Sequence, residues 1–372
     1  MPAQADYDLL CDFQRLYAAH RAARRGKRGN AAVIAFEMNL AENLCKLQAE
    51  LSKRTYAPKE YSHFTIFEPK KREIFAPRYE DRVVQHCICD NILAPMLEAR
   101  LIYDNAACRV GKGTHFALNR LSGFLRDFYR KHGSNGYFLK CDIQKFFANI
   151  DHRVLKQKLH RVFGSSDLFA LLCRIIDSYE NIPEVGLPLG NQTSQWFALF
   201  YLDGVDRLIK EKLQIRYYSR YMDDFVLLHH DKTHLRHCLA AIRAYCAGEL
   251  KLELNEKTQI LPVKNGVDYL GWHFYVCESG KIIRKLRNEK KRDIQRQMKR
   301  LTRDYREGRS DFGATKRSLV SIYGHLTHGH TYRLQNKLTR ETVFMTASGA
   351  SKPNFHCEHR PLRNRLRDIR EV

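Results

Sequence analysis

The sequence lacks the features that mark secreted, membrane-spanning and disulfide-bonded proteins. The N-terminal MPAQADYDLL has no basic start, apolar stretch or small-residue cleavage site, and no run of about 18 apolar residues occurs in the chain. The 11 cysteines are odd in number and include no CxxC pair, which predicts reduced, buried thiols. We therefore expect a soluble protein of the cytoplasm, with no membrane partner.

Two motifs that would indicate a bound metal or nucleotide are incomplete. His356, Cys357, Glu358 and His359 stand too close together for the usual zinc spacing, and no second pair of ligands accompanies them. The stretch 111–114, Gly-Lys-Gly-Thr, lacks the spacing of a Walker phosphate loop and is interpreted as the start of a helix near nucleic acid. Neither motif predicts a binding site of its own.

Acidic residues are scarce relative to basic ones. The 372 residues include 64 Lys and Arg against 41 Asp and Glu, a formal net charge of +23. With 44% hydrophobic residues the chain can bury a core, so the charge does not indicate disorder. A polyanionic partner is the default explanation, because Lys and Arg neutralise phosphates and release counterions.

The basic residues gather in three segments. Residues 21–28 contain five of them and no acid, which indicates either a solvated loop or, as we favour, a phosphate contact. Residues 70–72 are Lys-Lys-Arg, and residues 281–310 contain thirteen basic against four acidic residues. From the first and last segments we select six candidate nucleic-acid contacts: Arg24, Arg25, Lys285, Arg287, Lys291 and Arg292.

Hydrophobic periodicity predicts an α+β chain. Helices are expected within 7–51, from about 81, after 114, within 144–163, within 186–212 as a Pro/Gly turn and then one long helix, and over 234–250; strands are expected as a pair within 56–80, at 137–143, as two runs within 216–228, and at 269–275. Beyond residue 281 the period becomes helical, with Ile294, Met298, Leu301 and Tyr305 on one face. This change predicts a domain boundary near 280.

Three aspartates are placed for chemistry. Asp142 ends the apolar run YFLKCDI, and Asp223 and Asp224 form the corner between two apolar runs. Adjacent carboxylates repel each other, so something must offset their charge unless the corner is merely a solvated turn. Mg²⁺ prefers such oxygen ligands, and two ions about 3.5–4 Å apart can stabilise an attacking 3′-oxygen and a leaving pyrophosphate. The residues predict phosphoryl transfer on a nucleotide.

The segments around these aspartates resemble those of reverse transcriptases. Five blocks occur in that family's order: KCDIQKFF at 140–147, GLPLGNQTSQ at 186–195, YMDD at 221–224, LNEKT at 254–258 and YLGW at 269–272. The resemblance implies a right-hand polymerase that copies RNA into cDNA from dNTPs. Its parts would be N-terminal helices and fingers (1–135), a palm whose antiparallel sheet carries YMDD (136–280), a helical thumb (281–345) and a basic tail (346–372).

The resemblance also implies roles in the reaction. Asp142, Asp223 and Asp224 would hold two Mg²⁺ ions, for which Mn²⁺ can substitute, with help from the Ile143 carbonyl. Lys257 would donate a proton to pyrophosphate, although an ordinary surface lysine is an equal alternative.

Other positions correspond to contacts with the nucleotide and the primer. Phe147 matches an aromatic gate that excludes a 2′-hydroxyl, with a core aromatic as the alternative. Lys70 and Arg72 match cations that clamp the triphosphate, and Lys71 could replace Lys70. Gln195 would contact the nucleotide. The primer grip would consist of Tyr269, Leu270 and Gly271.

The strongest similarity is to reverse transcriptases of diversity-generating retroelements, a prokaryotic and phage group of the group II intron-like lineage. Gln195 follows Ser194 where group II intron and retron enzymes typically have Pro, and the string YGHLTHG at 323–329 also looks like this group. Such enzymes copy a template RNA with frequent errors and work with a small pentameric accessory protein. Leu199, where Asn is common, departs from the pattern.

Two alternatives stay open from the sequence. Antiphage reverse transcriptases share much of this architecture and would copy a dedicated non-coding RNA beside a second defence protein. A non-catalytic, maturase-like RNA-binding protein is the alternative of another class, against which the three retained aspartates argue. The roughly thirty residues after the predicted thumb are too few for an RNase H or integrase domain, so we expect a bare polymerase.

Overall fold

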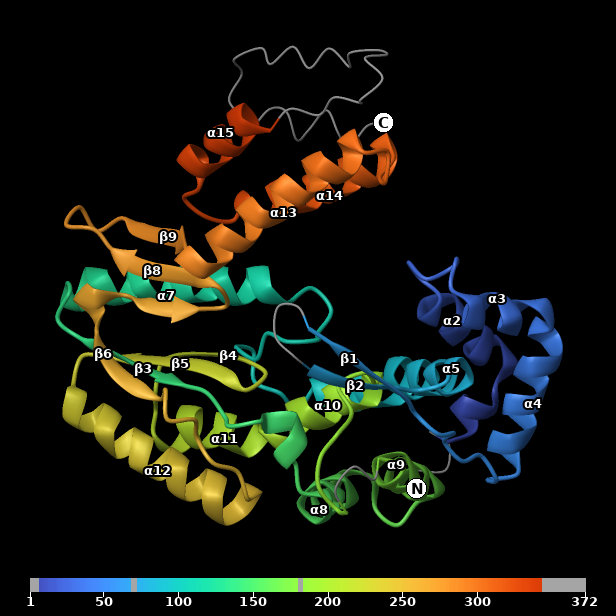
Figure 1. Ribbon diagram of the computed structural model, residues 1–372. Helices are drawn as coiled ribbons and strands as arrows, with labels where there is room; N and C mark the ends of the chain where they lie inside the picture. Colours follow the sequence, from blue (N-terminus) through green and yellow to red (C-terminus); the bar gives the residue numbers. More distant parts are fainter. Residues whose placement is uncertain (1–6, 68–71, 180–182, 343–372) are drawn as a thin grey trace. The chain divides into compact units, whose positions relative to one another are not determined.

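The computed structural model describes residues 7–67, 72–179 and 183–342 (Figure 1). The chain forms two units, one up to Ile283 and a second from Arg284. Helices and antiparallel sheets both occur, which confirms the mixed α+β class. No helix in these ranges is long and apolar enough to cross a membrane.

The first unit begins with the expected N-terminal helices. They are η1 (Leu9–Cys11), α2 (Phe13–Ala23), α3 (Ala31–Met38) and α4 (Leu40–Ser52). The α4 stripe buries Leu44, Leu47 and Leu51, and α2 packs against α5 (Tyr79–Ile88), which begins two residues before the predicted position. Short segments η2 (Cys89–Leu93) and α6 (Ala94–Glu98) continue α5.

A two-stranded hairpin precedes α5, as predicted. Strand β1 (Ser62–Ile66) pairs antiparallel with β2 (Arg72–Ala76), and Ile66 lies opposite Arg72. The predicted basic turn between them, with Lys70 and Lys71, lies outside the described residues.

The central sheet has the strand order β4-β5-β3-β6, and its pairs are antiparallel. Its strands are β3 (Tyr137–Cys141), β4 (Tyr217–Tyr221), β5 (Asp224–His229) and β6 (Gln259–Pro262). Helix α12 (Lys232–Leu250) packs against β3, β5 and β6, while α7 (Thr114–His132) packs against β4. In Figure 1 these helices lie on opposite sides of the sheet, so a helix covers each of its faces.

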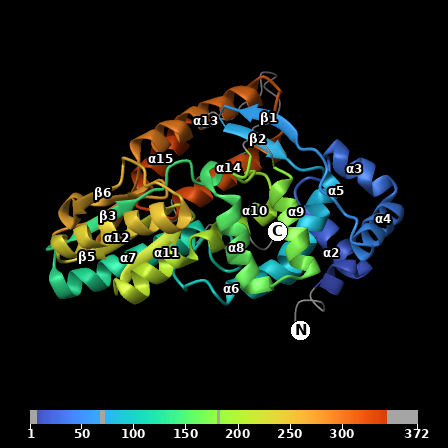
Figure 2. The ribbon, with the colours of Figure 1, turned by 90° about the horizontal axis from the view of Figure 1, so that it is seen from below.

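Further helices of the first unit surround the end of this sheet. They are η3 (Phe146–Asn149), α8 (His152–Phe163), α9 (Asp167–Asp177) and α10 (Gln192–Tyr201), of which α8 to α10 are visible in Figure 2. The predicted Pro/Gly turn precedes α10, but the prediction of one unbroken helix after it is wrong: α10 is followed by α11 (Asp203–Arg207) and the π-helical turn η4 (Leu208–Lys212). Leu202, with ψ 5°, leaves the helical conformation between α10 and α11. A Cβ at Gly204 would lie 2.0 Å from Tyr245 Oη of α12, so a larger residue there would require the Tyr245 side chain to move.

A second sheet has the order β7-β8-β9. The prediction of one strand at 269–275 is wrong, because β7 (Val267–Tyr269) and β8 (Trp272–Val276) form a hairpin. Its loop residues Leu270 and Gly271 both have positive φ, 49° and 84°, as two-residue type I′ turns require. The short η5 (Val263–Asn265) precedes β7, and β9 (Ile282–Leu286) leads into the second unit.

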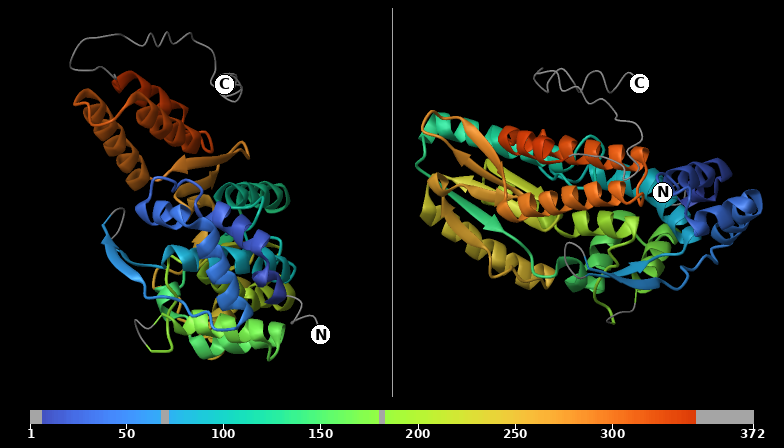
Figure 3. Two further views of the ribbon diagram at one scale, coloured as in Figure 1. Left: turned by 90° about the vertical axis from the view of Figure 1, so that its right-hand side faces the viewer. Right: turned by 45° about the horizontal axis from the view of Figure 1, so that its top comes forward.

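The second unit is helical from residue 288. Its helices are drawn in orange to red in Figure 3. It contains α13 (Asn288–Arg306), α14 (Phe312–Leu326) and α15 (Tyr332–Glu341). The predicted apolar stripe on α13 is confirmed, with Ile294 and Met298 buried and facing α14, while β9 was not predicted. The rest of α13 is covered with basic residues.

Candidate active site

The two adjacent aspartates lie at a strained hairpin turn. Tyr221 pairs with Asp224, which leaves Met222 and Asp223 as a two-residue loop between β4 and β5. Met222 has a φ of 56°, a left-handed conformation that costs about 1–3 kcal/mol for a residue other than glycine. A positive φ at the first loop residue alone is typical of a type II′ turn. The turn holds Asp223 at the corner and Asp224 at the start of β5.

The sheet register brings Asp142 to the same place. Cys141 lies opposite Phe225 in the β3-β5 pair, so the next position along puts Asp142 opposite Asp224. The pKa of Asp223 is raised, first by burial and also by the negative charge of Asp142, although its backbone hydrogen bond acts in the other direction. The three aspartates therefore meet at one end of the central sheet.

The segment after α12 fixes the end of β3. The Asn255 N–H donates to the Asp142 carbonyl at 2.7 Å, the Gln144 N–H donates to the Glu253 carbonyl at 2.9 Å, and Ile143 forms a bridge with Leu254. Ile143 is buried. This pairing explains why the LNEKT block lies beside the aspartates.

The donor atoms suit a divalent cation, since carboxylate oxygens are the ligands that Mg²⁺ and Mn²⁺ prefer. However, within the described ranges no group of three or more His, Cys, Asp or Glu side chains is arranged to hold a metal ion. One donor oxygen, Asp224 Oδ1, forms an ion pair with the ammonium of Lys140. Burial lowers the pKa of Lys140 to about 8, although Asp142 and Asp223 raise it. The oxygen ligands are present, but a lysine binds one of them.

A buried charge pair supports the turn from behind. Arg220 and Asp206 have no exposed surface, and the guanidinium donates to both carboxylate oxygens, at 2.7 and 2.6 Å. Arg220 also donates to the carbonyl of Met222 at 3.0 Å, and Tyr218 Oη donates to Asp206 at 2.6 Å. The sequence reasoning missed this pair; its only signal was one arginine in the otherwise uncharged run YYSRY.

Phe147 lies on η3, just beyond Asp142. Its ring is half-buried and packs edge-on against buried Phe146, with ring centroids 5.5 Å apart. The Leu187 N–H donates to the Phe147 carbonyl at 2.8 Å, which attaches the GLPLGNQTSQ block to this turn. Gly186 has a φ of 98°, and a Cβ there would lie 3.3 Å from the Ala148 carbonyl. The partial exposure of Phe147 distinguishes it from the core aromatic Phe146.

Gln195 faces a neighbour that the sequence did not indicate. Cys108 Sγ donates to Gln195 Oε1 at 3.0 Å. Cys108 is exposed and has a φ of 53°. The Ala106 N–H, two residues earlier, donates to the Arg220 carbonyl at 2.9 Å, so this segment is attached to the edge of β4.

The predicted primer grip is the β7-β8 turn. Tyr269 is buried, its hydroxyl lies 3.2 Å from Ser219 Oγ of β4, and burial raises its pKa. The Lys140 ammonium lies 5.2 Å from the centre of the Tyr269 ring. This turn is therefore connected to the aspartate end of the central sheet through Lys140.

Three predicted cations remain, Lys257, Arg72 and Lys70, of which the structure describes the first two. Lys257 is exposed, and its backbone N–H donates to Asn255 Oδ1 at 3.0 Å. Arg72 is exposed at the start of β2, whereas Lys70 lies outside the described residues.

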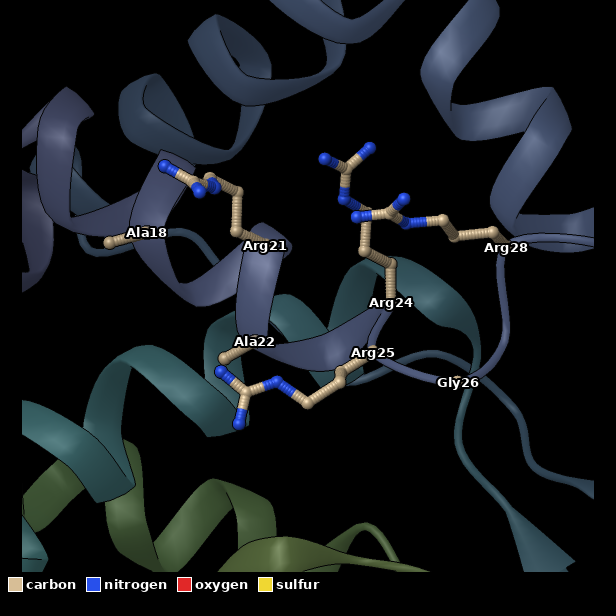
Figure 4. A pocket seen from close by; sticks show the side chains of 7 residues that line it. All are labelled: Ala18, Arg21, Ala22, Arg24, Arg25, Gly26 and Arg28. Carbon is tan, nitrogen blue, oxygen red and sulfur yellow. The ribbon is translucent and has the colours of Figure 1, made fainter. Parts of the chain in front are cut away.

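The C-terminal end of α2 and the basic segment that follows it line a hollow of about 500 Å³ (Figure 4). The residues that line it are Ala18, Arg21, Ala22, Arg24, Arg25, Gly26 and Arg28. The guanidinium groups of Arg24 and Arg28 face each other, whereas Arg25 points to another side. Arg24 also forms an ion pair with Glu37, which lowers the pKa of that carboxyl group. Four arginines lining one hollow make it a candidate site for an anion.

In the second unit, the predicted contacts lie at the end of β9 and the start of α13. Lys285, Lys291 and Arg292 are exposed, and Arg287 is half-buried beside Glu289, 3.4 Å away. These residues form one basic segment within their unit.

Comparison with known proteins identifies one family. The family described as "Reverse transcriptase (RNA-dependent DNA polymerase)" matches residues 59–274, which include all three aspartates. No curated protein matches the sequence.

Solved structures that resemble the chain include two telomerases. The apo telomerase of Candida tropicalis, truncated from its C-terminal domain, has 13% identity over 63% of this chain and 58% of its own, with a TM-score of 0.47. The telomerase of Candida albicans in complex with a TWJ fragment of telomeric RNA has 12% identity over 79% of this chain and 58% of its own, with a TM-score of 0.48. The chain thus spans less than two thirds of either structure.

Proposed function

This chain belongs to the reverse transcriptase (RNA-dependent DNA polymerase) family, and from that premise we propose that it copies RNA into cDNA by adding deoxynucleotides to a primer 3′-end. The single observation that carries the proposal is the meeting of Asp142, Asp223 and Asp224 at one end of an antiparallel sheet. In the corresponding hand-like arrangement, residues 1–135 form N-terminal helices and fingers, 136–280 the palm and 281–345 the thumb.

The three aspartates are the proposed ligands of two Mg²⁺ ions, or of Mn²⁺, with the Ile143 carbonyl as a further oxygen. Their donor chemistry fits these cations, and the pKa of Asp223 is raised first by burial and also by the negative charge of Asp142, both of which a bound cation would offset. Bound divalent ions would supply charge stabilisation to the attacking and leaving oxygens. The chain's own contribution is to fix the carboxylates, through the Arg220-Asp206 pair and the 253–255 segment.

The nucleotide is expected to lie between these carboxylates and the β1-β2 hairpin. Phe147 would face the sugar, where its half-exposed ring leaves no room for a 2′-hydroxyl. Arg72 and Lys70 would bind the triphosphate, and Gln195 would contact the nucleotide near Cys108. Lys257, being exposed, is available as the proton donor to pyrophosphate.

Template RNA and the RNA-cDNA duplex are the proposed macromolecular partners. The β7-β8 turn at Tyr269, Leu270 and Gly271 would position the primer end. Basic side chains at Lys285, Arg287, Lys291 and Arg292 would bind phosphates of the duplex, and the hollow at Arg24 and Arg25 those of a further RNA segment.

Primer extension tests the proposal directly. We expect Asp223→Asn with Asp224→Asn to abolish Mg²⁺-dependent synthesis on poly(rA)-oligo(dT) while its binding to this template-primer stays nearly unchanged. Asp231→Asn is a matched control, because Asp231 caps α12 by accepting from the Thr233 N–H and asparagine caps equally well. Synthesis by the double variant at the rate of the control would refute the assignment and favour a non-catalytic RNA-binding protein.

For the biological role, we propose error-prone copying in a diversity-generating retroelement, with a small accessory protein oligomer. The Ser194-Gln195 pair and the 323–329 string support this role. Leu199 departs from the pattern of that group, and the second candidate is an antiphage enzyme that copies a dedicated RNA. Sequencing of the RNA and cDNA that copurify with the protein decides between them: adenine-specific errors in a copy of a nearby gene repeat indicate diversity generation, and a repetitive or unrelated product made during infection indicates defence.

A further inference from the structure

Lys140 shares the aspartate end of the central sheet with the three carboxylates. It lies on β3 two residues before Asp142, and the negative charge of Asp142 acts on its ammonium group. On the neighbouring strand, Lys140 lies opposite Val226, and Asp224 is therefore its diagonal neighbour. A lysine side chain can span such a diagonal.

The ion pair between Lys140 and Asp224 is largely shielded from water. The two side chains are only 17% and 26% exposed. Apart from each other, Lys140 Nζ and Asp224 Oδ1 have no hydrogen-bond partner in the described part of the chain. The Tyr269 ring, 5.2 Å from the ammonium, covers it on another side. A buried charge with a single partner depends strongly on that partner.

The same oxygen is one that a divalent cation would need. A metal ion and an ammonium group are like charges, so both cannot stay within bonding distance of Asp224 Oδ1. Without a cation, by contrast, the positive charge of Lys140 offsets the repulsion among Asp142, Asp223 and Asp224.

We propose that Lys140 is a built-in counter-ion that holds Asp224 until a divalent cation displaces it, and so sets the affinity of the site for its first metal ion. Lys140 is a positioning residue that acts through Asp224. The proposal rests on the proposed function to the extent that the aspartates bind metal. It explains why the described residues contain the three carboxylates but no ready-made metal cage.

The test compares Lys140→Met with the unmodified protein by Mn²⁺ titration, followed by electron paramagnetic resonance without nucleotide or nucleic acid. We expect Mn²⁺ to bind on the order of tenfold more tightly to the variant, because a competing positive charge is removed. The apo variant should melt at a lower temperature than the apo parent, and saturating Mn²⁺ should remove most of that difference. Unchanged or weaker Mn²⁺ binding by the folded variant would overturn the proposal.

Lys158→Met is the matched control. Lys158 forms a similarly shielded pair with Asp203, with side chains 15% and 16% exposed, and its ammonium lies 5.4 Å from the Phe200 ring. This variant should lose stability to a similar extent without a change in Mn²⁺ affinity. An equal gain in affinity in both variants would show a general charge effect and overturn the proposal.

Two further measurements keep the test decisive. If Lys140→Met does not fold, acylation of lysines in the unmodified protein, mapped by mass spectrometry, should increase at Lys140 and not at Lys158 when Mn²⁺ is added. Equal labelling of Lys140 with and without Mn²⁺ would contradict displacement.

Loss of Mn²⁺ binding in Asp223→Asn with Asp224→Asn tests the proposed function separately. If that double variant binds Mn²⁺ as well as the parent, the assignment of the metal site to these aspartates is wrong. If the double variant loses Mn²⁺ binding but Lys140→Met has the Mn²⁺ affinity of the parent, only the proposed role of Lys140 is wrong.

Discussion

At the scale of single residues, the strained aspartate turn depends on a buried guanidinium. Arg220 joins Asp206 to the carbonyl of Met222. We predict that Arg220→Met lowers the free energy of unfolding by about 3–5 kcal/mol, because the buried Asp206 carboxylate loses its counter-charge. Urea denaturation followed by circular dichroism measures this loss, and primer extension should fall with it.

Two variants decide whether the loss comes from the unpaired charge. Arg207→Met removes an exposed ion pair with Glu211 and should change stability by less than about 1 kcal/mol. Adding Asp206→Leu to Arg220→Met should restore part of the lost stability, since no buried charge is then left alone. A double variant as unstable as the sum of both single changes would contradict this explanation.

Phe147 provides a prediction about substrate choice. Phe147→Ala should admit ribonucleotides, because removing the half-exposed ring makes room for a 2′-hydroxyl. The measurement is the ratio of kcat/KM for dNTP and the matching rNTP, which we expect to fall by on the order of 10–200-fold or more. Phe146→Leu, at the buried neighbour, should leave the ratio unchanged. If both variants change the ratio equally, Phe147 is a core residue and not a gate.

The sequence identified the three aspartates but not the residues that hold them. Asp142, Asp223 and Asp224 stand out because acids at strand ends are costly without a cation. Lys140 and Arg220 are single charges within short strands, and a strand sequence does not say what lies opposite a side chain. Their partners, Asp224 and Asp206, are brought to them only by sheet pairing and by the break between α10 and α11.

At the scale of elements, the loop before α10 depends on one glycine. The Gly186 N–H donates to the Ile150 carbonyl at 2.8 Å, and its own carbonyl lies 2.7 Å from His152 Nε2. Gly186→Ala should lower the free energy of unfolding by about 1–3 kcal/mol, because alanine is strained at positive φ and its Cβ would crowd Ala148.

Gly248→Ala is the corresponding control. Gly248 lies in α12 with no atom within 4 Å of an added Cβ, so alanine there should stabilise the protein by about 0.5–1 kcal/mol. Thermal unfolding of both variants checks the pair. Equal effects of the two substitutions would show that backbone conformation at Gly186 is not the cause.

The sequence correctly predicted those elements whose own residues show a clear hydrophobic pattern. Strands β3, β4 and β5 are apolar runs, and α13 combines an apolar stripe with basic faces. The break at Leu202 has no proline beside it to mark it in the sequence. The β7-β8 turn was missed because only one of its two left-handed residues, Gly271, is a glycine.

At the scale of the whole molecule, the charge of +23 predicts how RNA binding responds to salt. The logarithm of affinity should fall steeply and linearly with the logarithm of salt concentration. Lys291→Gln with Arg292→Gln should reduce the magnitude of that slope by about 2, one unit for each lost phosphate contact. Filter binding to a structured RNA over a range of KCl concentrations gives the slope.

The control for this charge effect is Lys337→Gln, at a lysine of the same unit that lies 3.4 Å from Glu341. Its slope should equal that of the unmodified protein. A nearly flat salt response of the parent would contradict phosphate neutralisation as the main source of affinity.

The measurement that tests the central claim most directly is single-turnover primer extension by Asp142→Asn, with RNA template-primer and dNTP saturating. Asp142 directly follows β3, whose last residue Cys141 lies opposite Phe225, so this variant removes the carboxylate beside the end of β3 and leaves the YMDD turn intact. We predict a fall in rate on the order of 10³-fold or more, with template-primer affinity within about twofold of the Asp231→Asn control. A rate close to that of the control would contradict the assignment of this site to DNA synthesis.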